Sequence, residues 1–496
     1  MLRGPLRVDP RAAVPWILSL IAALLCAACG NDARLHRALA LTDCRLPHVA
    51  QAAQCGKLSV PENRARPDGR HIDVFVAVLA ANTLDPKPDP LVLLAGGPGQ
   101  AASSIASLAQ LLGSVRRTRD IVLVDQRGTG RSAALSCKAF TADDRADFEL
   151  DPLRKARDCL AEIQARGVDP AQYTTEAFVE DLEAVRNALG YPRLNLWGGS
   201  YGTRVAQEYV RRHPDRVRTM ILDGVAPPSM RITLDVWRTR GQAIDDIVAA
   251  CHASTACSTA MPDPAATLAE LERRLRGAPA TVEDPRTGAP LEFPLTFDHV
   301  VAALQPLAYS PELAALVPEL LTRARDGDFA PLLAAALAFT ADLNEQLNAA
   351  LHYSVTCAED VPRIDEASRA QAVDHLRGGS LAARAMSVCT IWPRGAMPAD
   401  FTTPLRSDVP TLLLSGGLDP VTPPAYAAEV AKTLPNSRQV VASGFGHLVT
   451  PHACAPRLVA TFVDTATFDA LPASCIEFLQ HTTRPPFFVD RLAARP

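Results

Sequence analysis

Leu194-Asn-Leu-Trp-Gly-Gly-Ser-Tyr-Gly-Thr203 is the stretch that decides the fold, because it places Ser200 between Gly198 and Gly202 in a Gly-x-Ser-x-Gly pattern. A serine at the tip of a tight strand-to-helix turn is held in a strained backbone conformation with its hydroxyl exposed. Glycines on either side remove the β-carbons that would clash in such a turn. The pattern alone is weak, so its meaning depends on the segments that flank it.

These flanking segments have the periodicity of helices and strands. Phe178–Gly190 carries apolar residues at helical spacing and ends on a glycine, and Gly202–Arg212 predicts a second helix that ends at His213. Thr219–Asp223 then predicts a buried strand. Helix, strand, serine, helix and strand in this order are typical of a parallel sheet with crossover helices.

Further strands are predicted on both sides of the serine. Continuous apolar runs such as Leu91–Leu94 indicate central parallel strands that are covered on both faces. The sequence therefore predicts an α/β fold with a mostly parallel sheet and helices on both faces. The strands expected are His71–Leu79, Leu91–Ala95, Ile121–Asp125, Leu194–Trp197 and Met220–Asp223, and later Val409–Ser415 and Arg438–Ala442.

The segment between the two groups of strands is rich in alanine and leucine and shows helical periodicity without a clear strand series. We expect a helical lid inserted into the sheet domain, with a separate accessory domain as the alternative. The helices expected there are Ala266–Leu275, His299–Leu307, Pro311–Ala324 and Pro331–Leu351. The whole chain is divided into a signal peptide (1–28), an N-terminal segment (29–56), the first half of the sheet core (57–225), the lid (226–404) and the second half of the core with a C-terminal extension (405–496).

A nucleophilic serine needs a base, and the base needs an orienting carboxylate. Asp419 lies in a loop after the first late strand, and His447 follows the next strand through a glycine-flanked loop. The order Ser200, Asp419, His447 is the serine–acid–histidine order of α/β-hydrolases. His452 is the competing base, and Asp223 is the competing acid, for which a structural role is the alternative.

The oxyanion of an acyl-transfer reaction needs preorganised backbone N–H donors. One is expected from Tyr201, directly after the nucleophile, and the other from Gly97 in the loop Gly96-Gly-Pro-Gly99 after an apolar strand. A turn without function is the alternative for this loop. No metal and no organic cofactor is implied.

The N-terminus has the features of an export signal. Three arginines precede the apolar run Trp16–Ala28, which is too short for a membrane span and suits the apolar region of a signal peptide. Its end resembles a bacterial lipoprotein cleavage box with Cys29 as the lipidated residue. Because Cys26 stands where that box usually has leucine, ordinary cleavage after Ala28 stays open.

Cysteine spacing also favours export. Two of the 12 cysteines, Cys26 and Cys29, belong to the targeting segment, which leaves ten. An even set in an exported protein is typical of disulfides, whereas scattered buried thiols in a cytosolic protein are the alternative. No pair has the spacing of a zinc site. The expected pairs are Cys44/Cys55, Cys137/Cys159, Cys251/Cys257, Cys357/Cys389 and Cys454/Cys475.

Charge and length exclude one large class of function. The net charge is −4 over 496 residues, so no electrostatic argument supports nucleic-acid binding. The length allows a large core with an inserted domain.

Three motifs together resemble one family. Gly96-Gly-Pro-Gly99, Asp125-Gln-Arg-Gly-Thr-Gly-Arg-Ser132 and Gly198-Gly-Ser-Tyr-Gly202 are similar to those of the proline iminopeptidase and tripeptidyl aminopeptidase family of α/β-hydrolases. The resemblance implies serine exopeptidases that act at a free peptide N-terminus. It places Ser200, Asp419 and His447 at the triad positions, and Gly97 and Tyr201 at the oxyanion positions.

Other positions refine the resemblance. Arg127 matches a motif arginine expected to brace the oxyanion loop, with a solvent ion pair as the alternative. Proline-specific cytosolic members usually carry histidine before the glycine loop and tryptophan after the serine, where this chain has Ala95 and Tyr201. With the signal segment and the cysteine pairs, the chain is more similar to the exported tripeptidyl branch.

An exopeptidase must recognise a terminal ammonium, which requires an acidic group near the site. Glu359 and Asp360, close to Cys357 in the lid, are the candidates, and a solvated acidic turn or helix cap is the alternative. Trp392 is expected either as an apolar wall of the site or as packing.

The sequence therefore predicts a bacterial serine aminopeptidase, exported to the cell envelope as a lipoprotein or periplasmic protein or secreted, that acts on peptides with a free N-terminus. A carboxylesterase for small esters is the alternative enzyme, because fold and triad do not separate amides from esters. A non-catalytic envelope binding protein on a degenerate hydrolase scaffold is the alternative from another class.

Overall fold

The sheet at the centre of the molecule has nine strands. The computed structural model describes residues 39–140, 152–291 and 293–489, so the predicted signal segment and Cys29 lie outside the described residues. The strand order across the sheet is β1-β2-β3-β5-β4-β6-β7-β8-β9. The strands are β1 Thr42–Cys44, β2 Ala53–Pro61, β3 His71–Leu79, β4 Leu91–Leu94, β5 Ile121–Val124, β6 Leu194–Gly199, β7 Val217–Asp223, β8 Thr411–Gly416 and β9 Ser437–Ala442.

Strands β4 to β9 run parallel to one another, whereas β1, β2 and β3 pair in antiparallel fashion and join the sheet through β5. The mostly parallel α/β sheet is therefore confirmed, together with each strand that the sequence predicted. Strands β1 and β2 were not predicted. The boundary expected at residue 57 consequently falls inside β2, and residues 42–44 and 53–56 belong to the sheet.

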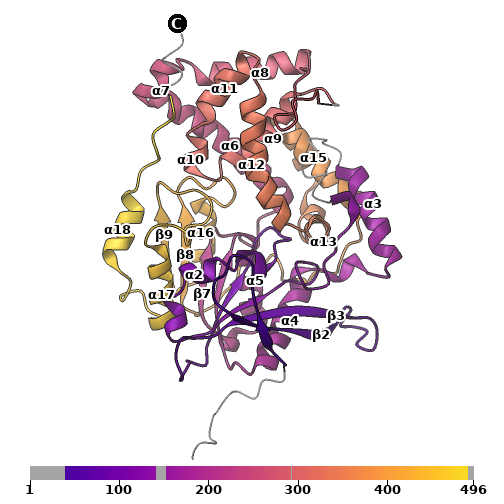
Figure 1. The fold of residues 1–496 in the computed structure, drawn as a ribbon, viewed down its shortest axis with the longest axis vertical. Coiled ribbons are helices and arrows are strands. Elements are labelled where there is room, and N and C mark those ends of the chain that lie inside the picture. Colours follow the sequence, from indigo (N-terminus) through magenta and orange to yellow (C-terminus); the bar gives the residue numbers. More distant parts are fainter. Residues whose placement is uncertain (1–38, 141–151, 292, 490–496) are drawn as a thin grey trace, which may run out of the picture.

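Helices cover both faces of this sheet (Figure 1). Along β4, the side chains of Val92 and Leu94 join one apolar cluster, and those of Leu91 and Leu93 join the cluster on the opposite face. This alternation follows from the two-residue period of a strand. Helices α3 Pro152–Ala165, α4 Thr175–Leu189, α5 Tyr201–Arg212 and α16 Pro424–Ala431 lie on the first face, and α2 Leu108–Leu111, α17 Ala455–Thr465 and α18 Ala473–His481 lie on the second.

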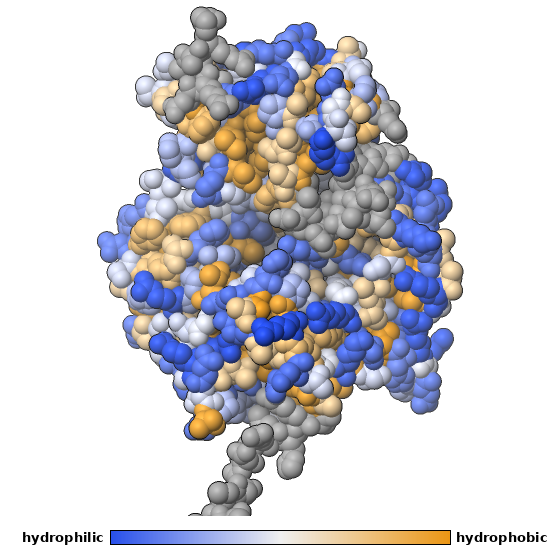
Figure 2. All heavy atoms as spheres, in the orientation of Figure 1, coloured by the Kyte–Doolittle hydropathy of each residue, from blue (hydrophilic) through white to orange (hydrophobic). Residues whose placement is uncertain are grey.

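The chain between β7 and β8 is helical, and it forms the upper part of the molecule in Figure 1. Its first helices enclose an apolar cluster of their own, whereas α13 and α15 contribute to the main core. In Figure 2 a patch of apolar side chains is visible on this part of the surface. The helices are α6 Ile232–Ala253, α7 Thr255–Ala260, α8 Pro264–Gly277, α9 Phe297–Leu307, α10 Pro311–Ala314, α11 Val317–Arg325, α12 Ala330–Gln346, α13 Ala349–Glu359, α14 Glu366–His375 and α15 Gly379–Ser387.

Two of the predicted helices are divided in the structure. The helix expected over Pro311–Ala324 is split into α10 and α11, and the one expected over Pro331–Leu351 ends at Gln346, after which Asn348 caps α13. Pro318 stands in the first turn of α11, where proline is tolerated because the N–H of that position has no helical partner. Periodicity found these helices without their breaks, and it did not single out α6, α7, α14 or α15.

Five disulfides join the same cysteines that the sequence pairing predicts: Cys44–Cys55, Cys137–Cys159, Cys251–Cys257, Cys357–Cys389 and Cys454–Cys475. Each closes a loop of 6 to 32 residues. Such cross-links stabilise a folded chain mainly by restricting its unfolded state. Within the described ranges, no helix combines the length and the apolar character needed to cross a membrane.

Candidate active site

Ser200 lies at the turn between β6 and α5 in a backbone conformation that is rare for residues other than glycine. Its φ is 54° and its ψ is −123°, and its N–H donates to the carbonyl oxygen of Asp223 at 2.9 Å. A β-carbon on Gly202 would lie 2.1 Å from the carbonyl oxygen of Leu94, so only glycine fits between the turn and β4. The strain that the sequence predicts at this serine is therefore present.

His447 and Asp419 form a buried pair beyond the ends of β8 and β9. The Nδ1 atom of His447 lies 2.8 Å from Oδ2 and 3.0 Å from Oδ1 of Asp419. Burial alone would raise the pKa of Asp419, but His447 and the N–H groups of Thr422 and Val421 hold that pKa below its usual value. Asp419 is consequently ionised at neutral pH and can orient the imidazole.

The two competing residues have other surroundings. The carboxylate of Asp223 accepts hydrogen bonds from the N–H groups of Val449 and Thr450, at 2.8 and 2.7 Å, and so fixes the loop that follows His447. His452 is exposed, and its ring lies 5.6 Å from that of Phe445. The imidazole of His447 is hydrogen-bonded to the carboxylate of Asp419. The described hydrogen bonds include none between the side chains of Asp223 and His447, and none between those of His452 and Asp419.

Ser200 and His447 line the same cavity, which has a volume of about 580 Å³. Gly97 lines it as well, at a φ of 107°. Among the described residues, the N–H groups of Gly97 and Tyr201 find no backbone carbonyl partner. Two backbone N–H groups without a carbonyl partner, near a serine, are the donors that a developing oxyanion requires. The roof of the cavity comes from the helical insertion, through residues such as Val236, Tyr309 and Tyr353.

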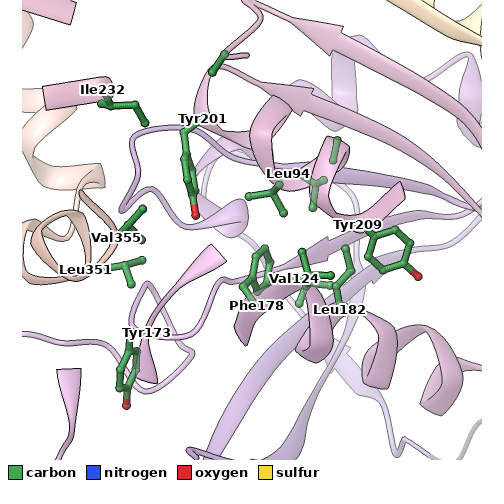
Figure 3. Packing of buried hydrophobic residues seen from close by; sticks show 14 of the residues in the cluster. Leu94, Val124, Tyr173, Phe178, Leu182, Tyr201, Tyr209, Ile232, Leu351 and Val355 are labelled. Carbon is green, nitrogen blue, oxygen red and sulfur yellow. The ribbon is translucent and has the colours of Figure 1, made fainter. Parts of the chain in front are cut away.

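The side chain of Tyr201 points away from the cavity into the main core. Figure 3 shows its ring near Ile232 and Val355. Its hydroxyl lies 2.6 Å from Oγ1 of Thr175 and accepts from Gln126 at 3.2 Å. Burial raises the pKa of this phenol, so it stays protonated. Thr175 in turn donates to Glu359 at 2.9 Å.

Glu359 and Asp360, the residues predicted to bind a substrate amine, lie on the far side of Tyr201 and outside the described lining of the cavity. Both are buried against Arg204, whose Nη1 lies 3.1 Å from Asp360 and 3.5 Å from Glu359. Burial raises the pKa of Glu359 to about 7. The solvated acidic turn that was the alternative is wrong, because both carboxyl groups are enclosed.

The position of these acids follows from the course of α13. Its first half carries His352 and Tyr353, which line the cavity, whereas Glu359 ends the helix. Seven residues of α-helix separate His352 from Glu359, about 10 Å along the axis. The sequence placed the acids on the correct helix, but that helix passes the cavity and ends behind α5.

Arg127 is fully buried, so a solvent ion pair is wrong for it. Its guanidinium binds both carboxylate oxygens of Asp181 at 2.6 Å and the carbonyl oxygens of Glu62 and Gln172. The residue that joins this motif to the segment after the glycine loop is instead Asp125, which accepts from the N–H of Ser103 at 2.7 Å. The contact expected of Arg127 is therefore made by Asp125, two residues earlier in the same motif.

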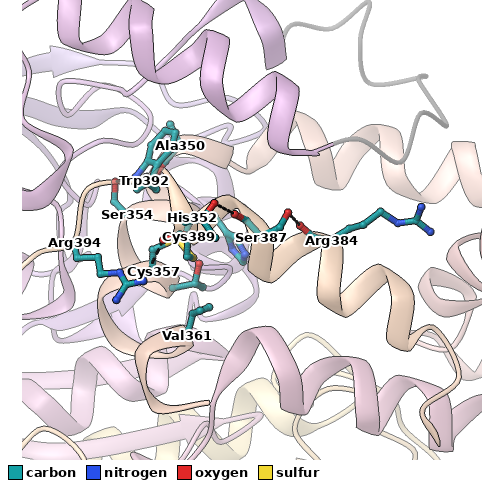
Figure 4. Close-up of a disulfide and its surroundings, with 12 residues drawn as sticks. Ala350, His352, Ser354, Cys357, Val361, Arg384, Ser387, Cys389, Trp392 and Arg394 are labelled. Atoms are coloured by element: carbon teal, nitrogen blue, oxygen red, sulfur yellow. Dashed lines mark hydrogen bonds between the residues drawn. A yellow bond between two sulfur atoms is a disulfide. The ribbon is translucent and has the colours of Figure 1, made fainter. Parts of the chain in front are cut away.

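Trp392 packs behind the cavity. Its ring lies 5.5 Å from that of Tyr353, and its Nε1 donates to Ser354 at 3.0 Å. Figure 4 shows Trp392 and Ser354 beside the Cys357–Cys389 disulfide, which ties α13 to the segment after α15. Packing, rather than a wall of the site, is the interpretation that its contacts support.

Several polar residues of the site were not predicted. Thr422 donates to Oδ2 of Asp419 at 2.8 Å and lies 3.2 Å from Nδ1 of His447. Arg240, Glu312 and His352 line the cavity from the insertion. Glu312 directly follows Pro311, which marks the start of a predicted helix after a short turn. This proline is the one sequence signal that could have indicated a helix start, with Glu312 in its first turn, near the site.

Comparison with known proteins identifies the family of this fold. Residues 89–450 match the family model for the α/β hydrolase fold. The serine protease Hip1 of Mycobacterium tuberculosis is 26% identical over 450 residues, 82% of this chain and 84% of that protein. The tripeptidyl aminopeptidase of Streptomyces coelicolor is 32% identical over 200 residues, which cover 37% of each chain. A crystal structure of a proline iminopeptidase from Mycobacterium smegmatis, 19% identical, covers 85% of this chain and 97% of its own at a TM-score of 0.36.

The family match spans most of the chain and contains the serine, the acid and the histidine of the cavity. The chain therefore belongs to the α/β hydrolase fold family and is a serine hydrolase. The resemblance predicted from its motifs also stands, since relatives named tripeptidyl aminopeptidase and proline iminopeptidase match it.

Proposed function

We propose that the protein is a serine exopeptidase in which Ser200, His447 and Asp419 form the catalytic triad. One observation carries this proposal. Ser200, in its strained backbone conformation, lines the same cavity as His447, and the Nδ1 atom of His447 is hydrogen-bonded to the buried carboxylate of Asp419. His447 takes the proton of Ser200 as the hydroxyl attacks the scissile carbonyl, and then gives it to the leaving amine. Asp419 holds the ring in the required tautomer and stabilises its charged form.

The N–H groups of Gly97 and Tyr201 stabilise the tetrahedral oxyanion. Because Tyr201 is anchored by its hydroxyl to Thr175 and Gln126, its N–H is fixed before substrate arrives. Donors that need no reorganisation are worth about 3 kcal/mol each in barrier height. Water then repeats the sequence on the acyl-enzyme, with His447 as base.

Action at a free N-terminus is supported by the names of the relatives and by one acidic residue. Of the described residues that line the cavity, Glu312 is the one carboxylate. A hydrogen bond from Ser310 lowers the pKa of Glu312, so it is ionised at neutral pH. We assign the substrate ammonium to Glu312 in place of the Glu359–Asp360 pair, which faces Arg204.

Matched peptides with a free and an acetylated N-terminus test this function. We expect kcat/KM at least about tenfold higher for the free peptide, the effect of one charge-assisted contact. Glu312→Gln should remove that advantage, whereas Glu270→Gln on the surface of α8 should keep it. Equal turnover of both peptides would contradict the exopeptidase and favour the carboxylesterase.

We further propose that residues 226–404 act as a lid and that the protein is exported. The insertion supplies the roof of the cavity, including Tyr309 and Tyr353, which supports the lid. Five sequence-local disulfides support an oxidising compartment. Mass spectrometry of the mature protein tests the N-terminal processing: a lipidated Cys29 is expected, and an N-terminus at Met1 would contradict export.

A further inference from the structure

Arg240 of α6 lines the cavity without a carboxylate partner. Its Nη2 donates to the hydroxyl of Tyr309, its guanidinium carbon lies 5.1 Å from the centre of that ring, and its Nε is buried without a hydrogen bond. No described acidic side chain lies within ion-pair distance of it. A cation is therefore present in the site with unused donor capacity.

The fully buried arginines of the described chain have other surroundings than Arg240, whose side chain is half-buried. Arg119 pairs with Asp89, Arg127 with Asp181 and Arg204 with Asp360, at N–O distances of 2.9, 2.6 and 3.1 Å. An unpaired charge away from water is expensive, so internal arginines are normally matched by acids. Arg240 lacks such a carboxylate partner among the described residues, and it lines the cavity, where a ligand can reach it.

Arg240 lies one aromatic ring away from the catalytic histidine. The ring of Tyr309 contacts Arg240 on one side and meets the imidazole of His447 edge-on at 5.4 Å on another. A group bound by Arg240 would therefore lie in the same cavity as Ser200 and His447.

The other charged or titratable groups around Arg240 do not neutralise it. Burial lowers the pKa of His352, and Arg240 lowers it further, so this imidazole is neutral at pH 7. Glu312 is hydrogen-bonded to Ser310 and makes no ion pair with Arg240. The cavity is therefore lined by one carboxylate and one guanidinium that form no ion pair with each other.

We propose that Arg240 is a specificity residue that binds a carboxylate of the substrate, such as an aspartate or glutamate side chain adjacent to the scissile bond. This inference builds on the proposed function and names its substrate class. A guanidinium presents parallel N–H donors that match a carboxylate. A neutral amide of the same shape leaves the charge unpaired, so discrimination of about tenfold or more is expected.

The first test needs no variant. Two peptides with a free N-terminus are compared at each residue flanking the bond, one with glutamate and one with glutamine. We expect kcat/KM to be at least about tenfold higher for glutamate at one of these positions. Equal values at both positions would overturn the proposal.

The second test separates recognition from support of Tyr309. Arg240→Gln should abolish the preference mainly by lowering kcat/KM for the glutamate peptide, and Arg240→Lys should retain part of it. Arg238→Gln, two residues away and paired with Asp235 on an exposed side chain, is the control and should keep the preference. Equal losses on both peptides in Arg240→Gln would show a purely structural role and overturn the proposal.

A third test stays valid if the protein is an esterase and hydrolyses no peptide. Glutarate is added to hydrolysis of p-nitrophenyl butyrate, with the neutral diamide of glutarate as control. Competitive inhibition by glutarate in the wild type, weakened at least about tenfold in Arg240→Gln, supports the carboxylate site. Absent inhibition, or equal inhibition of both proteins, would overturn it.

Discussion

Arg204 of α5 and Arg240 of α6 are two arginines near Ser200 whose side chains have different partners. Arg204, in the helix that begins after Ser200, faces the carboxyl groups of Glu359 and Asp360 in a closed cluster. Arg240, in the insertion, faces an open cavity, and among the described residues its side-chain partner is Tyr309. We propose that the matched charges of the Arg204 cluster stabilise the fold, whereas the unmatched charge of Arg240 in the cavity is available to a substrate.

The largest expected effect is a loss of kcat on substitution of Ser200, which lines the cavity. Ser200→Ala should lower kcat by about three orders of magnitude or more, because the remaining oxyanion donors and binding contacts retain only a small part of the rate. Thermal unfolding should be nearly unchanged, since the hydroxyl serves the reaction and not the core. Steady-state kinetics with a circular-dichroism melt checks both points, and a loss under about tenfold would remove Ser200 from the mechanism.

For the buried cluster of Arg204, Glu359 and Asp360, the expected loss is one of stability. Arg204→Met leaves the buried Glu359 without its counter-charge and Asp360 with Arg363 alone, at 3.0 Å, which should lower the free energy of unfolding by about 3–5 kcal/mol. Arg240→Gln should lower it by about 1 kcal/mol or less, the value of one hydrogen bond. Urea unfolding of the two variants measures the contrast, and equal losses would show that the two arginines do not differ in role.

The closed cluster should also make stability depend on pH. The pKa of Glu359 is raised from 4.5 to about 7 in the folded protein, so the folded state binds this proton more tightly than the unfolded state. Stability from this group is present below pH 4.5 and is lost as the pH rises to about 7, by at most about 3 kcal/mol. Glu359→Gln should therefore gain stability relative to the wild type between about pH 5 and 8. A constant difference across that range would contradict the buried, proton-binding carboxyl.

The smallest effect concerns the support of the triad. Thr422→Val removes the hydroxyl that donates to Asp419 at 2.8 Å but keeps the shape of the side chain. Loss of one hydrogen bond to a charged group, about 1.5 kcal/mol, corresponds to roughly tenfold in kcat. Kinetics on one peptide from acid to alkaline pH checks this, and unchanged kcat would mean that the N–H groups of Val421 and Thr422 hold Asp419 alone.

Much of the fold could be predicted because local patterns report local structure. The runs at β4 and β5 are apolar on both faces. The glycines on either side of Ser200 occupy positions where a β-carbon would collide with neighbouring backbone atoms, so the turn is visible in the sequence. The short strand β1 could not be predicted in this way, since Thr42–Cys44 is three residues long and largely exposed. Its pairing depends on a partner strand more than on its own composition.

The lining of the cavity was harder to predict because it is assembled over long distances. Arg363, three positions after Asp360, pairs with it, but nothing near Glu359 and Asp360 in the sequence shows that Arg204, over 150 positions earlier, is a partner of both. Arg240 and Glu312 come from different helices of the insertion. Periodicity indicates the helices but not the side of each helix that meets the serine.

Serine-dependent cleavage at a free N-terminus is tested most directly by one digestion analysed by mass spectrometry. A peptide and its N-acetylated form are mixed in one tube with wild-type protein, and a second tube contains Ser200→Ala. We expect short N-terminal fragments to appear only from the free peptide and only with Ser200 present. Equal cleavage of the acetylated peptide, or undiminished cleavage by Ser200→Ala, would contradict the assignment of a serine exopeptidase.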